Sequence, residues 1–192
     1  GILPLATAVL SALRGNEKPS AGFWGMALLG AALVVGFALR QSGGSLHPAD
    51  LLMLGAVVLA AAGYAEGGRL ARSLGGVQVI SWALVLSAPL LAPVVLWLTW
   101  PQHAAIAAAG PAAWAGFAYV AAFSMLIGFF FWYRGMALGG IARVGQVQLV
   151  QPFMTLAGAA LLLGEPLTAS NCAFALAVIA VVAAGRKMQV GR

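Results

Sequence analysis

Three polar side chains at helical spacing inside an apolar stretch are the strongest candidates for chemistry in this sequence. Gln148, Gln151 and Thr155 are separated by three and four residues, so they lie along one face of a helix. In apolar surroundings an amide or hydroxyl group must find a partner, which can be a neighbouring helix, water or a bound solute. The stripe therefore predicts either the wall of a solute cavity or a seam of hydrogen bonds between helices, and the pattern alone favours neither.

Pro152 interrupts this stripe. Proline has no N–H, so it removes one backbone hydrogen bond and can kink a helix. We expect the carbonyl that loses its partner to bind a solute, water or a neighbouring side chain.

Four other residues are candidates by depth or by ring chemistry. Ser87 and Ser124 lie deep within apolar stretches, and Trp82 and Tyr119 could stack on an aromatic or aliphatic solute. These positions extend the predicted solute-binding set beyond the polar stripe.

Groups for catalysis or metal binding are scarce. His47 and His103 have no paired ligand spacing, and Ser124 lacks the flanking glycines of a nucleophile turn. The single cysteine, Cys172, lies in an apolar stretch and is expected to pack as a small hydrophobic residue. We therefore expect no enzyme, no cofactor and no metal.

The composition sets the class of protein. Hydrophobic residues make up 62% of the chain and charged residues only 7%, too few to cover a soluble domain with polar surface. Continuous apolar stretches without strand-like alternation predict membrane-spanning helices. We predict an all-α integral membrane protein, a helical bundle of about seven transmembrane segments. The predicted spans are six full stretches and one partial stretch: 22–39, 50–66, 77–100, 112–133, 144–163 and 169–184, with 1–13 as the partial one.

The basic residues predict the orientation. With the carboxyl terminus in the cytoplasm, alternation of the spans puts nine of the ten lysines and arginines on the cytoplasmic side and only Arg40 on the other. This positive-inside bias accounts for the net charge of +6 without a nucleic-acid partner. The predicted location is a bacterial-type inner membrane.

A motif occurs twice, once near each end of the chain. Its members recur at a constant offset of 148: Pro4 and Pro152, Thr7 and Thr155, Glu17 and Glu165, Ser20 and Thr168, Ala21 and Ala169. The predicted topology puts the two copies on opposite sides of the bilayer, and such inverted repeats are typical of secondary transporters. Within each copy, the glutamate is expected to cap the helix that follows it rather than to couple protons.

The second copy and the residues before it resemble a known family. Gln151-Pro152, the run 159–168 (AALLLGEPLT) and the run 129–140 (FFFWYRGMALGG) are similar to motifs of the EamA-type members of the drug/metabolite transporter superfamily. The resemblance implies ten helices in two inverted five-helix repeats. It covers essentially the whole chain, although the first copy has a more polar turn.

The resemblance also implies a domain organisation. Residues 1–40 would be the last two helices of a truncated first repeat, 49–186 the complete second repeat, and 187–192 a cytoplasmic tail. The first three helices of the family would then be absent from this chain, or supplied by a partner or a second copy.

The implied function is that of a permease that exports small metabolites, amino acids or drug-like solutes by alternating access. The alternatives are a non-transporting membrane scaffold or assembly subunit, and an inactive fragment. The expected partners are a small-molecule solute and the lipid bilayer.

Overall fold

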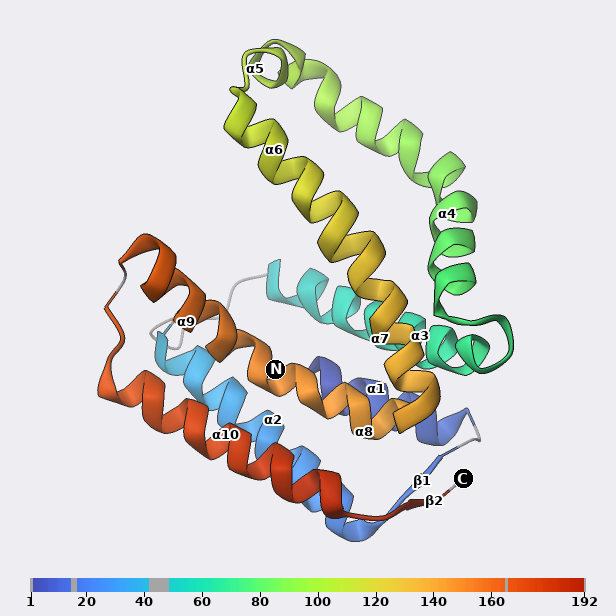
Figure 1. Cartoon of the computed structure of the whole chain (residues 1–192), viewed down its shortest axis with the longest axis vertical. Helices are drawn as coiled ribbons and strands as arrows, with labels where there is room; N and C mark the ends of the chain where they lie inside the picture. Colours follow the sequence, from blue (N-terminus) through green and yellow to red (C-terminus); the bar gives the residue numbers. More distant parts are fainter. Residues whose placement is uncertain (1, 15–16, 42–48, 165, 192) are drawn as a thin grey trace. The chain divides into compact units, whose positions relative to one another are not determined.

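The computed structural model describes residues 2–14, 17–41, 49–164 and 166–191, and they are mainly helical (Figure 1). The chain divides into two compact units, one formed by 1–66 with 139–192 and the other by 67–138. The helices are α1 (Leu3–Leu13), α2 (Ala21–Gln41), α3 (Ala49–Leu74), α4 (Gly76–Thr99), α5 (His103–Ala107), α6 (Pro111–Tyr119), α7 (Gly128–Gly139), α8 (Ile141–Gly145), α9 (Gln151–Leu163) and α10 (Ala169–Lys187). Between them lie the 3₁₀ segments Trp100–Gln102 and Gln146–Val150 and the π-helical segment Val120–Ile127.

Five helical stretches of the described chain are long and apolar enough to cross a membrane: Ala21–Arg40, Leu51–Leu74, Gly76–Ala107, Pro111–Gly139 and Ile141–Leu163. Two shorter apolar helices, Leu3–Leu13 and Ala169–Gly185, occupy the remaining predicted segments. The all-α membrane class is therefore confirmed. One feature differs from the expectation of helices alone, because the two-residue strands β1 (Lys18–Pro19) and β2 (Val190–Gly191) pair antiparallel.

In the first unit, α2 and α10 lie side by side and run in opposite directions (Figure 1). Gly22 at the start of α2 adjoins the Met188 side chain just beyond the end of α10. At the other end of the pair, the rings of Phe37 and Phe174 have centroids 5.3 Å apart. The core of this unit is a cluster of buried apolar side chains: Val34, Phe37, Leu149, Phe153, Val178 and Val182.

The helices of the two sequence copies begin at matching positions. Helices α1 and α9 begin at Leu3 and Gln151, and α2 and α10 begin at Ala21 and Ala169. Both pairs of starts differ by 148, since 151 − 3 = 148 and 169 − 21 = 148. The sequence offset is thus matched by the secondary structure.

The two copies also form matching hydrogen bonds within their first helices. The hydroxyl of Thr7 donates to the Leu3 carbonyl at 2.9 Å, and that of Thr155 donates to the Gln151 carbonyl at 3.1 Å. These bonds join residues that correspond at the offset of 148.

The second helix of each copy is capped in the same way. The Ser20 hydroxyl accepts from the Phe23 N–H at 3.3 Å, and the Thr168 hydroxyl accepts from the Asn171 N–H at 3.2 Å. In both copies a hydroxyl therefore satisfies an N–H of the first turn, which would otherwise have no helical partner.

In the second unit, α4 approaches α7 closely at Gly76, which has no side chain. A Cβ placed on Gly76 would lie 2.6 Å from the carbonyl oxygen of Phe130. The preceding Gly75 has φ of 83°, a conformation that favours glycine. The small residues after α3 thus let the backbone turn and pack tightly against α7.

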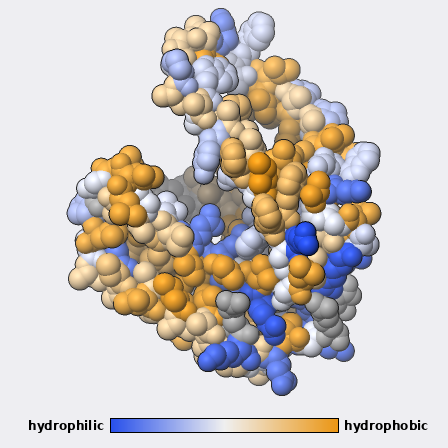
Figure 2. Space-filling model, viewed as in Figure 1, coloured by the Kyte–Doolittle hydropathy of each residue, from blue (hydrophilic) through white to orange (hydrophobic). Residues whose placement is uncertain are grey.

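Apolar side chains cover much of the visible surface, as a lipid-facing protein requires (Figure 2). On this face of the first unit, hydrophilic residues gather at the end where β1 and β2 lie (Figure 2). The polar strand pair thus belongs to the hydrophilic end of that unit.

Candidate functional site

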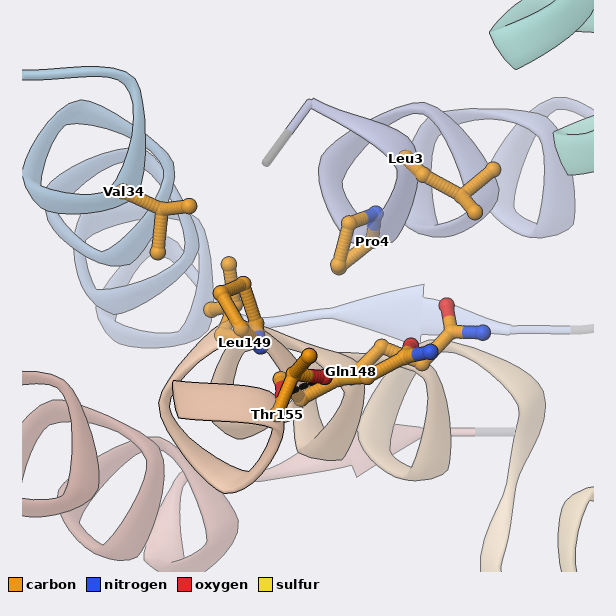
Figure 3. Close-up of a pocket in the computed structure, with 8 residues that line it drawn as sticks. Leu3, Pro4, Val34, Gln148, Leu149 and Thr155 are labelled. Carbon is orange, nitrogen blue, oxygen red and sulfur yellow. Dashed lines mark hydrogen bonds between the residues drawn. The ribbon is translucent and has the colours of Figure 1, made fainter. Parts of the chain in front are cut away.

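The first unit contains a hollow of about 240 Å³ between α1, α2 and the helical segment that runs from 146 to 163 (Figure 3). The three residues of the predicted polar stripe lie on its wall, and so do both prolines of the repeated motif. The described lining is Leu3, Pro4, Val34, Gln148, Leu149, Gln151, Pro152 and Thr155. Residues that are far apart in the sequence, and that correspond at the offset of 148, therefore meet at one place.

Pro152 determines the backbone beside the hollow. It lies in the first turn of α9, directly after the 3₁₀ segment Gln146–Val150. Because proline cannot donate to the carbonyl four residues earlier, Gln148 O loses its α-helical partner. The Gln151 N–H donates to that carbonyl instead, as in a 3₁₀ turn. The expectation that solute, water or a side chain would satisfy the freed carbonyl is therefore wrong, and the backbone satisfies it locally.

The polar wall carries amide and hydroxyl groups. Gln148 Oε1 is buried and accepts no hydrogen bond from the described residues. Leaving a buried acceptor unpaired costs about 1–3 kcal/mol. Thr155 Oγ1 donates to the Gln151 carbonyl and keeps its lone pairs as acceptors. Gln151 and Thr155, which are exposed, can offer an amide donor and oxygen acceptors to a molecule in the hollow.

The opposite wall is apolar and comes from the first copy of the motif. Leu3 and Pro4 project from α1 and Val34 from α2 (Figure 3). The sequence reasoning named Pro4 as a motif residue but missed Leu3, Val34 and Leu149 as wall residues. Leu3 corresponds to Gln151 at the offset of 148, so the repeat could have identified Leu3 as a wall residue.

Gln146, which sequence reasoning also missed, holds α1 against the segment from 146 to 163. It is buried, and its Nε2 donates to the Pro4 carbonyl at 3.3 Å. This bond joins the two segments that form the facing walls, so it sets their separation.

The other four predicted binding residues belong to the second unit, whereas the described lining of the hollow comes from the first. Trp82 and Tyr119 are 57% and 63% exposed, and the Tyr119 ring stacks on Phe123 at 5.4 Å. Ser87 lies on α4 and donates to the Leu84 carbonyl at 3.1 Å. Ser124 is exposed in the π-helical segment.

Glu17 caps a helix, but a different one from the helix expected. Its side chain is only 2% exposed, and its two carboxylate oxygens accept from the Ile141 and Ala142 N–H groups at 2.6 and 2.7 Å. The expected capping of the following helix is wrong, because Ser20 has that role. A carboxylate at a helix start also stabilises the helix dipole. The equivalent Glu165 lies outside the described residues.

Gly140, directly before that helix, leaves room for the carboxylate. It has φ of 90°, and a Cβ placed on it would lie 3.3 Å from Glu17 Oε1. A turn of this conformation, which strongly favours glycine, therefore brings the two N–H groups to the Glu17 side chain.

Comparisons with known proteins agree with the helical membrane fold. Residues 47–184 match the EamA-like transporter family. A protein of Bacillus subtilis strain 168 described as "Uncharacterized transporter YdeK" is 52% identical over 187 residues, which are 97% of this chain and 64% of that protein. The chain thus spans less than two thirds of the length of this relative. No solved structure matches the chain.

Proposed function

Because the chain belongs to the EamA-like transporter family, we propose that it forms part of a bacterial-type inner-membrane permease. This permease moves small metabolites, amino acids or drug-like solutes outward by alternating access. The carboxyl terminus is on the cytoplasmic side, as the distribution of basic residues favours.

The single observation that supports this function best is the hollow lined by Gln148, Gln151 and Thr155 together with Pro4 and Pro152. Secondary transporters bind solutes between repeats, where discontinuous helices expose polar groups. Here two matching helix starts face each other, and a 3₁₀ segment interrupts the helix on one side. We propose that this hollow is the solute site.

The opposite directions of α2 and α10 support an inverted repeat. These helices correspond at the offset of 148, yet they pack antiparallel. In a rocking mechanism, two hairpins related in this way would alternately close opposite ends of the site. The end of the first hairpin that carries Glu17 is one proposed closing end.

A flux measurement on the complete native protein tests this function. Cells that express it, or membrane vesicles made from them, are compared with cells that lack it for the small molecules that leave or accumulate. The double substitution Gln148→Leu with Gln151→Leu should keep membrane insertion but lower flux by about five- to tenfold, if each lost hydrogen bond contributes about 0.6 kcal/mol. Gln78→Leu is the matched control, because Gln78 is an exposed glutamine on α4.

Two results would contradict the proposal at different points. Unchanged flux and selectivity in the double variant would show that the hollow is not the solute site. If no solute changed its distribution when the protein was expressed, a scaffold or assembly subunit would explain the chain better.

A further inference from the structure

We propose that the solute of the hollow is a small uncharged molecule, with hydrogen-bond donors and acceptors along one edge and an apolar opposite side. This inference rests on the proposed function, because it names the class of solute for the same site. It narrows the proposed solutes to uncharged ones and leaves out amino acids, whose ammonium and carboxylate groups are charged.

The size of the hollow suits a small solute. Its volume of about 240 Å³ is below the roughly 300 Å³ at which pockets for drug-sized ligands begin. A single ring or a short branched chain with one polar group fits this space.

The described lining suits an uncharged solute better than one with a full charge. The described residues around the hollow include no acid and no base. An ion moved from water into apolar surroundings needs an opposite charge or several strong hydrogen bonds. An uncharged solute needs neither, so it suits this site better.

The polar wall calls for a group that both donates and accepts. The exposed amide of Gln151 can both donate and accept, and the hydroxyl hydrogen of Thr155 is already engaged with the Gln151 carbonyl. The two glutamine amides supply donors as well as acceptors. A carboxylate only accepts and an ammonium or amidinium only donates, so each would leave part of the wall unmatched. A carboxamide or a similar neutral group matches both kinds of group.

The lining has a polar wall and an apolar wall, and these determine how the solute would be oriented. The amide and hydroxyl groups lie on the segment from 146 to 163, whereas Leu3, Pro4 and Val34 face them from α1 and α2 (Figure 3). The solute would bind with its polar edge against the first wall and its apolar side against the second.

Three probes of nearly equal shape test the charge preference: benzamide, benzoate and benzamidinium. Each is titrated against the complete protein purified in detergent, and the rise in unfolding temperature gives an apparent Kd. We expect benzamide to bind, and benzoate and benzamidinium to bind at least about tenfold more weakly. Equal or tighter binding of either ion, or no binding by any probe, would overturn the inference.

Substitutions locate the binding in the hollow. Gln151→Glu places a carboxylate on the polar wall, so benzamidinium should become the preferred probe by about tenfold. Gln148→Leu should weaken benzamide binding, and the control Gln78→Leu should leave all three constants unchanged. If Gln151→Glu left the order of the probes unchanged, they would bind elsewhere and the inference would fail.

Uptake by vesicles separates this inference from the proposed function. Movement of a charged probe without movement of benzamide would overturn the solute class and leave transport intact. Tight benzamide binding without movement of any probe would count against transport and leave the class of ligand intact.

Discussion

The hairpins α1–α2 and α9–α10 share their helix starts, a threonine bond and a hydroxyl cap, but they contribute differently to the hollow. At corresponding positions, Leu3 stands on one wall and Gln151 on the other, while Pro4 faces the hollow together with its counterpart Pro152. The two hairpins share a backbone arrangement but differ in the side chains at corresponding positions. Near-symmetric helices can therefore build a site with one apolar and one polar wall.

The turn of the first hairpin shows a second difference. Glu17 in this turn binds the start of the helix that leads to the second hairpin. The contact joins residues 124 and 125 positions apart in the sequence. The first hairpin thus serves as a structural anchor for α8, whereas the second contributes Gln151 and Thr155 to the hollow.

The largest expected effect concerns the sides of the membrane on which the two hairpin turns lie. In a Cys172→Ser background, Leu167→Cys should react with a membrane-impermeant thiol reagent added outside intact cells, and Lys18→Cys should not. The reason is the proposed inversion, which puts equivalent turns on opposite sides. Equal labelling of both positions would break the comparison, and labelling after lysis is the control for reactivity.

The next effect concerns the anchor. Glu17→Ala leaves two buried N–H groups without their carboxylate and should lower the free energy of unfolding by about 3 kcal/mol. Unfolding in mixed detergent micelles measures this loss. Glu66→Ala is the control, because the ion pair of Glu66 with Arg14 at 3.4 Å is partly exposed and should contribute less than about 1 kcal/mol. Equal losses in the two variants would contradict the role of Glu17.

Helix packing in the first hairpin gives an intermediate effect. A Cβ on Gly30 would lie 2.6 Å from Leu149 Cδ1, whereas one on Gly36 in the same helix would meet nothing within 4 Å. Gly30→Ala should therefore destabilise the protein by about 1–3 kcal/mol. Gly36→Ala should be neutral or stabilise it by up to about 1 kcal/mol. The same micelle unfolding assay compares the two, and an equal response would show that α2 does not pack as described.

The smallest effect compares corresponding threonines. Thr7 is 0% exposed, and a Cβ placed on Gly145 of α8 would lie 3.6 Å from Thr7 Cγ2, whereas Thr155 lines the hollow. Thr7→Val should lower stability by about 1 kcal/mol without changing benzamide affinity. Thr155→Val should weaken benzamide binding with a smaller loss of stability. The reverse pattern would show that the two copies do not divide their roles in this way.

Part of the candidate site could be predicted from the spacing of residues along one helix. Gln148, Gln151 and Thr155 share a face because three- and four-residue steps return to one side of a helix. The partner of Glu17 was not readable, because no local rule connects it to Ile141. The capping prediction failed for that reason, since it considered only the helix that follows in the chain.

The predictions for the freed carbonyl and for the aromatic residues show the same limit. Sequence rules state that Pro152 removes a bond from Gln148 O, but the choice of the Gln151 N–H as replacement depends on the backbone geometry. Trp82 and Tyr119 were selected for their ring chemistry. They lie on exposed surfaces of the other unit, and their binding role stays a prediction.

The sequence by itself determined the membrane class, the helical segments and the repeat offset of 148, because hydropathy and spacing act along the chain. The tertiary structure decided that Pro4 and Pro152 line one hollow, that Leu3, Val34 and Leu149 complete it, and that Glu17 holds the start of a distant helix. These contacts depend on which helices pack together and in which direction. Local sequence patterns do not specify this packing, because it depends on the three-dimensional surfaces of helices that are far apart in the chain.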